Sequence, residues 1–436
     1  DKTEVMKTNI PKIKYAYSDD FTIAYQVWGS SKDTIVYVPG IVSHLEVTLE
    51  FEGYKHWLEK LSKKFTVIIF DKRGQGMSDR DMQITGIEPR IDDISAVVEA
   101  EGVKNFSLFG LSEGAAIALF YAAAYPQKVN SVAILGGFAH VHSTDDSWIE
   151  HWGEGISGYA LCPHMMPEIK DKIGKFERMT CNPKILRRMM ETNRKIDIRS
   201  ILSEINTPTL VCHSRDDMTT IKEDGRYLAE QIKGAKYIEY AHGGHLPYFG
   251  LQYELSQDLT DFYLRFTDKN SFKTNENDKL ATILFSDIVN STLKLSSYGD
   301  KKWKDLMDDH DRIVKEKAGK YSGQFIKNTG DGALVVFDGP IRGIKYALEF
   351  QSEIKSLGIE CRCGLHIGQI EWRDSDISGI AVNIASRVMD LSHPNKVSIT
   401  KTLGDLIAGS KIDTRSIGLY TLKGISDNIE ILEIST

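Results

Sequence analysis

The chain has 436 residues, of which 41% are hydrophobic and 26% charged, and its formal net charge is −7 at pH 7. This composition is typical of an ordinary globular protein, and the length favours two domains. The acidic balance argues against a nucleic-acid-binding protein, because no excess of positive charge is available to meet phosphates.

The sequence shows no clear membrane span, signal peptide or paired cysteine pattern. No apolar run approaches the roughly twenty residues that span a bilayer, and the opening DKTEVMKTNIPK lacks the apolar core of a signal peptide. The five cysteines are scattered, and Cys361 and Cys363 lie in an apolar strand pattern with no second pair for zinc. We therefore expect a soluble cytoplasmic protein with reduced thiols and no membrane span.

The first predicted domain covers residues 1–268. Runs typical of strands alternate with helical runs such as 54–61 and 115–124, which predicts a doubly wound, mainly parallel α/β sheet with helices on both faces. Residues from about 140 to 200 break the alternation and are expected to form a helical cap over the carboxyl edge of the sheet, where α/β proteins bind ligands. The strand candidates are 34–38, 65–70, 106–109, 132–135, 208–212 and 237–240.

A candidate nucleophile lies in the sequence GLSEG at 110–114, where a strand passes into a helix. The glycines allow a tight turn that exposes Ser112 as a nucleophile elbow. Asp217 and His245 follow in the order that this fold uses. His245 would remove the serine proton, and Asp217 would orient the imidazole and stabilise its charged form. Asp216 and His242 remain alternatives to these two.

The oxyanion of such a reaction needs backbone donors. The N–H groups of Ile41, after the turn at 39–40, and of Glu113 are the candidates.

Residues 13–267 resemble the α/β-hydrolase family, and the stretches that carry the resemblance are VPGIVSHLE, FDKRGQGMSD, GLSEG and GGHLPYF. Two departures leave hydrolysis and ligand binding without turnover both open: Pro39-Gly40 replaces the family's usual His-Gly, and Glu113 places a carboxylate beside the nucleophile.

A polar linker is expected at 269–278, before a second domain at 279–436. Its first apolar run, ILFSDIVNST at 283–292, reads as a buried strand that carries Asp287. Asp331 lies in a Gly-Asp-Gly turn before a strand at 333–337. Carboxylates on adjacent strand ends would suit a hard divalent cation such as Mg²⁺. Further helices (303–317, 341–357, 380–389) and strands (323–326, 360–366) predict an α+β sandwich of ferredoxin-like type.

Residues 279–434 resemble the catalytic domain of class III nucleotidyl cyclases. The motifs that carry this resemblance are FSDIVNST, KNTGDG, CGLHIG, DISGIAVNIASR and LKGI. The resemblance implies two Mg²⁺ or Mn²⁺ ions per site and a head-to-tail homodimer in which each site takes residues from both protomers. The residues that match the family's motifs are metal ligands Asp287, Asp331 and the Ile288 carbonyl, base-selecting Lys327 and Asp376, transition-state residues Asn383 and Arg387, and triphosphate-binding Lys423.

Physical chemistry agrees with these roles. Arg387 offers a planar fork of donors to a phosphorane, and Asn383 lies on the same helical face, four residues away. Adenine presents an acceptor at N1 and a donor amino group, which Lys327 and Asp376 match, whereas guanine presents the reverse. We therefore expect ATP as the substrate and cyclic AMP with pyrophosphate as products.

The order of the domains resembles the lipase–cyclase fusions of mycobacteria, and three interpretations remain. The first is an adenylate cyclase whose hydrolase-like domain senses or processes a small apolar ester or related ligand. The second is primarily a serine esterase or lipase with a minor cyclase activity. In the third, the first domain is a ligand sensor without turnover. Such a sensor requires that the ligand bind with different affinities to two states of the cyclase.

Overall fold

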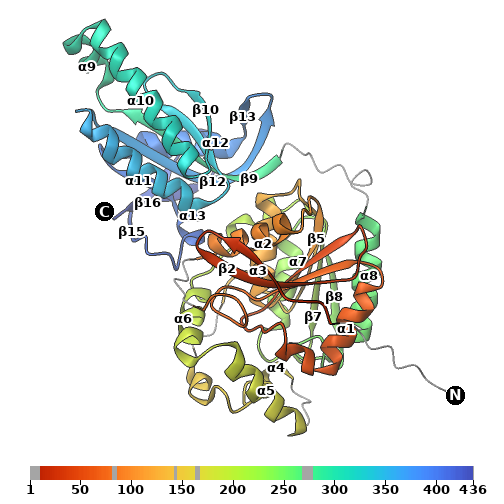
Figure 1. Cartoon of the computed structure of the whole chain (residues 1–436). Coiled ribbons are helices and arrows are strands. Elements are labelled where there is room, and N and C mark those ends of the chain that lie inside the picture. The colour runs from red at the N-terminus through yellow and green to blue at the C-terminus, as the bar shows by residue number, and fades with distance from the viewer. Residues whose placement is uncertain (1–9, 81–85, 142–144, 163–166, 268–277, 436) are drawn as a thin grey trace, which may run out of the picture.

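The computed structural model describes residues 10–80, 86–141, 145–162, 167–267 and 278–435, which fold around two eight-stranded sheets (Figure 1). The first sheet is built from the N-terminal part of the chain and the second from the C-terminal part. The predicted combination of an α/β and an α+β fold is confirmed. The predicted linker lies outside the described residues, except for Asp278, the first residue of the second sheet.

The first sheet has the order β1-β2-β4-β3-β5-β6-β7-β8, and its strands from β4 to β8 run parallel. The expected doubly wound sheet is therefore present, but β1 and β2 were not predicted. They form an antiparallel edge in which β1 alternates exposed and buried residues and gives little apolar signal. The strands are β1 (Lys14–Ser18), β2 (Phe21–Trp28), β3 (Thr34–Val38), β4 (Thr66–Phe70), β5 (Phe106–Leu111), β6 (Val129–Leu135), β7 (Thr209–Ser214) and β8 (Lys236–Tyr240).

Helices cover both faces of this sheet. On one face α1 (Glu52–Ser62) and α8 (Gln252–Tyr263) pack against the strands. On the other face lie α2 (Glu88–Ala100), α3 (Glu113–Ala124) and α7 (Lys222–Gln231). Every residue of the alanine-rich α3 is buried. Small side chains allow this helix to lie close to its neighbours on all sides.

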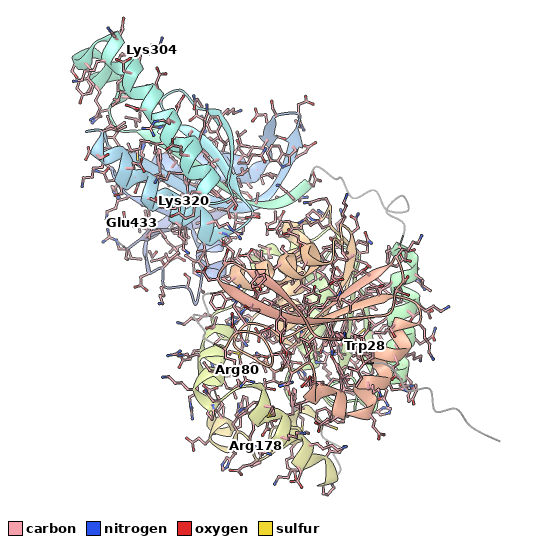
Figure 2. All side chains as sticks on the ribbon, in the orientation of Figure 1. Trp28, Arg80, Arg178, Lys304, Lys320 and Glu433 are labelled. Carbon is pink, nitrogen blue, oxygen red and sulfur yellow. The ribbon has the colours of Figure 1, made fainter. Side chains whose placement is uncertain are left out.

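The predicted cap region holds α4 (Gly158–Leu161), α5 (Pro167–Thr180) and α6 (Pro183–Asn193), followed by the 3₁₀ turn η3 (Arg199–Glu204). Two labelled arginines attach these helices (Figure 2). Arg80, in the loop after β4, donates to the carbonyl of Met179 at 2.7 Å, and Arg178 donates to the carbonyl of Gly153. The first contact fixes the cap to a loop at the carboxyl edge of the sheet, and the second lies within the cap.

The second sheet has the order β10-β11-β9-β12-β14-β16-β15, with β13 paired to β12. The predicted strand at 333–337 has the bounds expected, whereas β9 begins earlier and ends at Ile288. Asn290, with φ 56°, turns the chain there into α9. The strands are β9 (Asp278–Ile288), β10 (Gln324–Asn328), β11 (Ala333–Phe337), β12 (Cys361–Arg373), β13 (Asp376–Ser378), β14 (Val397–Thr400), β15 (Thr414–Thr421) and β16 (Asn428–Ile434). The helices are α9 (Ser291–Tyr298), α10 (Asp300–Lys320), α11 (Pro340–Ser356), α12 (Ile380–Leu391) and α13 (Lys401–Leu406).

The two parts of the chain share one large apolar cluster, which includes Tyr121 of α3 and Leu280 of β9. Figure 1 shows the second sheet and its helices standing against the α2 and α3 side of the first. All five cysteines are buried. Among the described helices, none has the length and apolarity that crossing a membrane requires.

Candidate functional site

The two predicted metal-binding carboxylates lie on neighbouring elements. Asp287 is the penultimate residue of β9, and Asp331 lies in the turn between β10 and β11, where β11 pairs with β9 through Ala333 and Ser286. A Cβ at Gly332 would fall 1.8 Å from the carbonyl oxygen of Ser286, so only glycine permits this approach. Burial raises the pKa of Asp287, and the nearby charge of Asp331 raises it further.

Arg362 on β12 is a site residue that the sequence did not predict. It lies opposite Asp287 in the strand pairing, and its Nε and Nη2 approach Oδ2 of Asp287 at 3.0 and 2.8 Å. The local signal was an arginine that stands between two buried cysteines, Cys361 and Cys363. The guanidinium partly neutralises the carboxylate and lowers its pKa against the effect of burial.

These residues fit a divalent cation whose remaining ligands would come from the substrate. Within the described ranges, no three His, Cys, Asp or Glu side chains form a metal-binding group. Mg²⁺ commonly uses only one or two carboxylates and takes further oxygens from phosphates and water. Ile288, whose carbonyl is the third predicted ligand, ends β9 directly beside Asp287.

The predicted base-selecting residues form an ion pair. Lys327 on β10 places Nζ 2.5 Å from Oδ2 of Asp376, the first residue of β13, and both side chains are about half exposed. The N–H of Ile377 also donates to Asp376 at 2.8 Å. The hydrogen bond from Lys327 lowers the pKa of Asp376. The structure therefore holds one donor and one ionised acceptor side by side.

The remaining predicted cyclase residues lie on other elements than the carboxylates. Asn383 and Arg387 are on α12, and Arg387 donates to Asp390 at 3.2 Å. Lys423 is exposed in the turn between β15 and β16. Across the described part of the chain, no hydrogen bond or ion pair joins these three side chains to Asp287 or Asp331. Within the described part of one protomer, hydrogen bonds and ion pairs therefore do not join these groups to the carboxylates.

Ser112 occupies the turn from β5 into α3 with φ 55° and ψ −122°, a conformation that is strained for a residue other than glycine. A Cβ at Gly114 would collide with the carbonyls of Val38 and Pro39, so this glycine is needed for the helix to approach β3. Ser112 is 7% exposed. The geometry is that of the predicted nucleophile elbow.

The structure joins Asp217 to His245 rather than the alternative residues. Oδ2 of Asp217 lies 2.7 Å from Nδ1 of His245. Burial raises the pKa of Asp217, but His245 and backbone donors outweigh it and hold this pKa below its ordinary value. Asp216 instead accepts from the N–H groups of Gly243 and Gly244, and His242 is exposed. Among the residues that the structure describes, no hydrogen bond joins Ser112 to His245.

The predicted oxyanion donors border Ser112. Glu113 is the first residue of α3, where the backbone N–H has no preceding helical carbonyl to bind. A Cβ at Gly40 would lie 3.2 Å from Cβ of Ser112, which places the loop leading to Ile41 close over the serine. The carbonyl of Ile41 accepts from the Gln75 side chain.

The Glu113 side chain is buried in a charged cluster that the sequence did not reveal. It is 2% exposed and forms ion pairs with Arg90 and with Lys72, the latter at 3.1 Å, and it accepts from Asn193 at 2.8 Å. Burial raises the pKa of Glu113, but Arg90 and Lys72 bring it below its ordinary value. Burial also lowers the pKa of Lys72 to about 8. The carboxylate of Glu113, next to Ser112, is therefore neutralised by its neighbours.

Comparison with known proteins gives two separate matches. Residues 33–161 match the family model of the alpha/beta hydrolase fold, and residues 273–434 match that of the adenylate and guanylate cyclase catalytic domain. Serine hydrolase BPHL of Mus musculus is 25% identical over 255 residues, which cover 55% of this chain and 81% of that protein.

The cyclase part has a relative of its own, and the hydrolase part has a structural neighbour. "Putative adenylate cyclase 3" of Rhizobium meliloti (strain 1021) is 27% identical over 162 residues, which are 35% of this chain and 28% of that protein. A hydrolase from Pseudomonas aeruginosa PA01 has a crystal structure that aligns with a TM-score of 0.50 and 20% identity over 58% of this chain and 99% of its own. That likeness concerns the fold alone.

Proposed function

Because the chain carries an α/β-hydrolase domain followed by an adenylate and guanylate cyclase catalytic domain, we propose that it is an adenylate cyclase that converts ATP to 3′,5′-cyclic AMP and pyrophosphate. The observation that supports this most directly is the pairing of Asp287 with Asp331 at neighbouring strand ends. Two Mg²⁺ or Mn²⁺ ions bound there would neutralise the triphosphate and acidify the ribose 3′-hydroxyl for attack on the α-phosphorus.

The chain's own residues would bind and orient the nucleotide. Arg362 contacts Asp287, and its guanidinium could also donate to a phosphate oxygen of the nucleotide. Lys423 would add a second positive charge at the triphosphate. Asn383 and Arg387, one turn apart on α12, would donate to the charge that develops on the phosphorane.

The ion pair of Lys327 with Asp376 supports ATP as the substrate. The ammonium would donate to N1 of adenine, and the carboxylate would accept from the 6-amino group. Guanine would leave both charged groups mispaired, at a cost of about 1–3 kcal/mol each. ATP is therefore preferred over GTP.

A head-to-tail homodimer would complete the site. A single protomer carries the metal carboxylates and, on other elements, the residues for the base and the transition state. Two-fold symmetry can bring each set against the complementary set of the partner and form two equivalent sites. Specific activity should then fall on dilution, and a specific activity that stays constant into the nanomolar range would contradict a weak dimer.

The proposal is tested by measuring cyclic AMP formation from ATP with Mn²⁺ or Mg²⁺ supplied. Asp287→Asn and Arg387→Ala should each lower turnover by at least about 100-fold, because the first removes a carboxylate that would hold the cations and the second removes a cationic donor to the reacting phosphates. Asp305→Asn, an exposed carboxylate of α10, is the matched control and should leave turnover unchanged. Turnover within a few-fold of the wild type in either site variant would reject the assignment.

The hydrogen bond of Asp217 to His245 and the strained Ser112 favour a second candidate function, a serine hydrolase that acts on a small apolar ester. The domain could instead bind such a ligand without turnover. Screening short and long acyl esters in the cyclase assay distinguishes these alternatives. If Ser112→Ala abolishes ester cleavage but leaves an ester-dependent change in the cyclase rate intact, the domain is a sensor. If both are lost, control depends on the product.

A further inference from the structure

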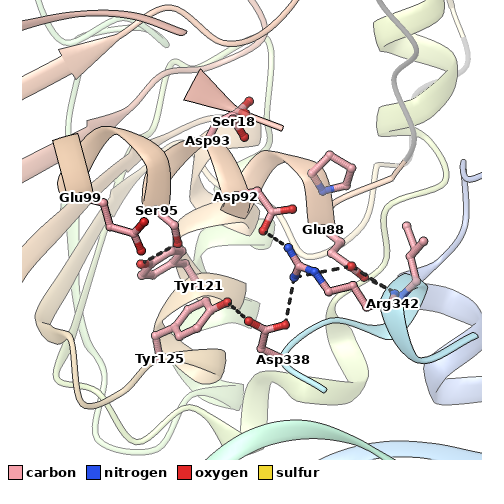
Figure 3. A network of polar contacts seen from close by, with 12 residues as sticks. Ser18, Glu88, Asp92, Asp93, Ser95, Glu99, Tyr121, Tyr125, Asp338 and Arg342 are labelled. Atoms are coloured by element: carbon pink, nitrogen blue, oxygen red, sulfur yellow. Dashed lines mark hydrogen bonds and ion pairs between the residues drawn. The ribbon is translucent and has the colours of Figure 1, made fainter. Parts of the chain in front are cut away.

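The helix α11 of the cyclase domain takes its N-terminal cap from the hydrolase domain (Figure 3). Glu88 of α2 is 3% exposed and accepts from the N–H of Ile341 at 2.5 Å and from the N–H of Arg342 at 3.2 Å. The helix has no acidic residue in its own first turn and no side-chain bond at its N-cap, Gly339. A Cβ at Gly339 would collide with the Glu88 carboxyl group, so this glycine makes room for the cap.

Arg342 ties the same helix to two more carboxylates. It donates to Asp92 of α2 at 2.6 Å and to Asp338 at 2.9 Å (Figure 3). Asp338 also accepts from the hydroxyl of Tyr125, the residue after α3, at 2.6 Å. Asp338 directly follows β11, and β11 begins two residues after Asp331. The hydrolase domain therefore holds the far end of the strand that leaves the metal-binding turn.

The first turn of α2 also faces the hydrolase site. Arg90, between Glu88 and Asp92 in sequence, pairs with Glu113 beside the nucleophile. Arg90 also donates to Asn193 at 2.9 Å, and Asn193 is the last residue of the cap helix α6. One helical turn thus contacts the nucleophile elbow, the cap and the cyclase domain.

The cap touches the cyclase domain directly as well. A Cβ at Gly409, which follows α13, would lie 3.1 Å from the methyl group of Thr192 on α6. The end of α6 is therefore in contact with both domains. A movement of the cap displaces groups on both sides of this contact.

We propose that Glu88, Asp92 and Tyr125 are positioning residues of the cyclase site, and that Arg90 and Asn193 make their position depend on the state of the cap. This inference rests on the proposed cyclase function. The positioning groups hold the N-terminus of α11 and the end of β11. A shift of about 1 Å at a reacting centre can change a rate 100-fold. Two arrangements of the cap would thereby give two cyclase rates.

The positioning role is tested with Glu88→Gln and Tyr125→Phe in the full-length chain. Glu99→Gln is the matched control, since Glu99 lies on the same helix, is 69% exposed and pairs only distantly with Lys128. Both test variants should lower the cyclase kcat at least about fivefold and leave the KM for ATP unchanged. Hydrogen exchange at the amides of residues 341 and 342 should become faster in Glu88→Gln. If kcat is unchanged in Tyr125→Phe, which removes a single oxygen, and in a folded Glu88→Gln, the proposal is wrong.

The link to the cap is tested by a double-mutant cycle between Asn193→Ala and Tyr125→Phe. If both residues act through the same arrangement of the cap, the change in kcat of the double variant should differ by more than about twofold from the product of the two single changes. Effects that multiply within that factor would show that Asn193 does not act through the positioning residues. Wild-type protein that forms no cyclic AMP would refute the proposed function itself, whereas active protein with insensitive variants refutes only this inference.

Discussion

Gly332 provides a test of the proposed metal-binding turn by a single methyl group. A Cβ at this position would lie 1.8 Å from the carbonyl oxygen of Ser286, whereas real Cβ contacts are essentially never shorter than 3.0 Å. In Gly332→Ala the obstacle is the backbone of β9, so β9 and the turn must separate by at least about 1.2 Å, more than the roughly 1 Å misplacement that lowers a rate 100-fold. Overpacking of this kind also costs about 1–3 kcal/mol of stability.

The assay is cyclic AMP formation at saturating Mn²⁺ and ATP, together with a thermal unfolding curve for each variant. We expect Gly332→Ala to lose at least about 100-fold in kcat while remaining folded at the assay temperature. Gly319→Ala is the control, because it adds the same methyl group to α10, where nothing lies within 4 Å. If Gly332→Ala keeps most of the wild-type turnover, the close approach of β9 to this turn is not required.

Three further changes test other parts of the chain. Lys327→Glu should reduce the ratio of kcat/KM for ATP to that for GTP by about tenfold, because one hydrogen bond to adenine is lost and one charge is reversed; an unchanged ratio would reject base selection by this residue. Glu113→Gln should lower the free energy of unfolding by about 3–5 kcal/mol, because Arg90 and Lys72 lose a buried counterion; denaturant titration measures this, and an unaltered midpoint would show that the cluster is not stabilising. The pKa of Asp217 lies below its ordinary value in the folded chain, so its ionised form stabilises the fold above about pH 3.9 and this contribution is lost as the pH falls through the lower folded-state pKa. Asp217→Asn should therefore weaken the acid dependence of stability below about pH 4, and superimposable pH profiles would contradict this reasoning.

Local signals predicted much of the fold. The strands at 34–38 and 333–337 are continuous apolar runs buried along their length, and their predicted bounds are those of the structure. The order of serine, aspartate and histidine led to Asp217 and His245, which lie in contact. The strand β1 escaped prediction because a half-exposed edge strand lacks such a run. β2 is mostly buried, but Thr22 and Gln26 interrupt its apolar run.

Residues whose role depends on distant partners could not be predicted from sequence. Arg362 reaches Asp287 only because the pairing of β12 with β9 places them opposite each other, 75 residues apart in the chain. Glu113 departs from the family pattern by placing a carboxylate beside Ser112, but its partner Asn193 is 80 residues away. The contact of Glu88 with α11 spans 253 residues. No periodicity or motif carries information about pairings of this kind.

The complete burial of α3 bears on how the chain is made and how it comes apart. Its cluster draws on apolar side chains from both sheets. During synthesis the N-terminal domain emerges first, and the side of α3 next to β9 stays uncovered until that strand has left the ribosome. A fragment that stops before β9 should therefore aggregate more readily than the whole chain. Calorimetry of the intact protein should show one merged heat-absorption peak, because neither domain can melt without uncovering the other.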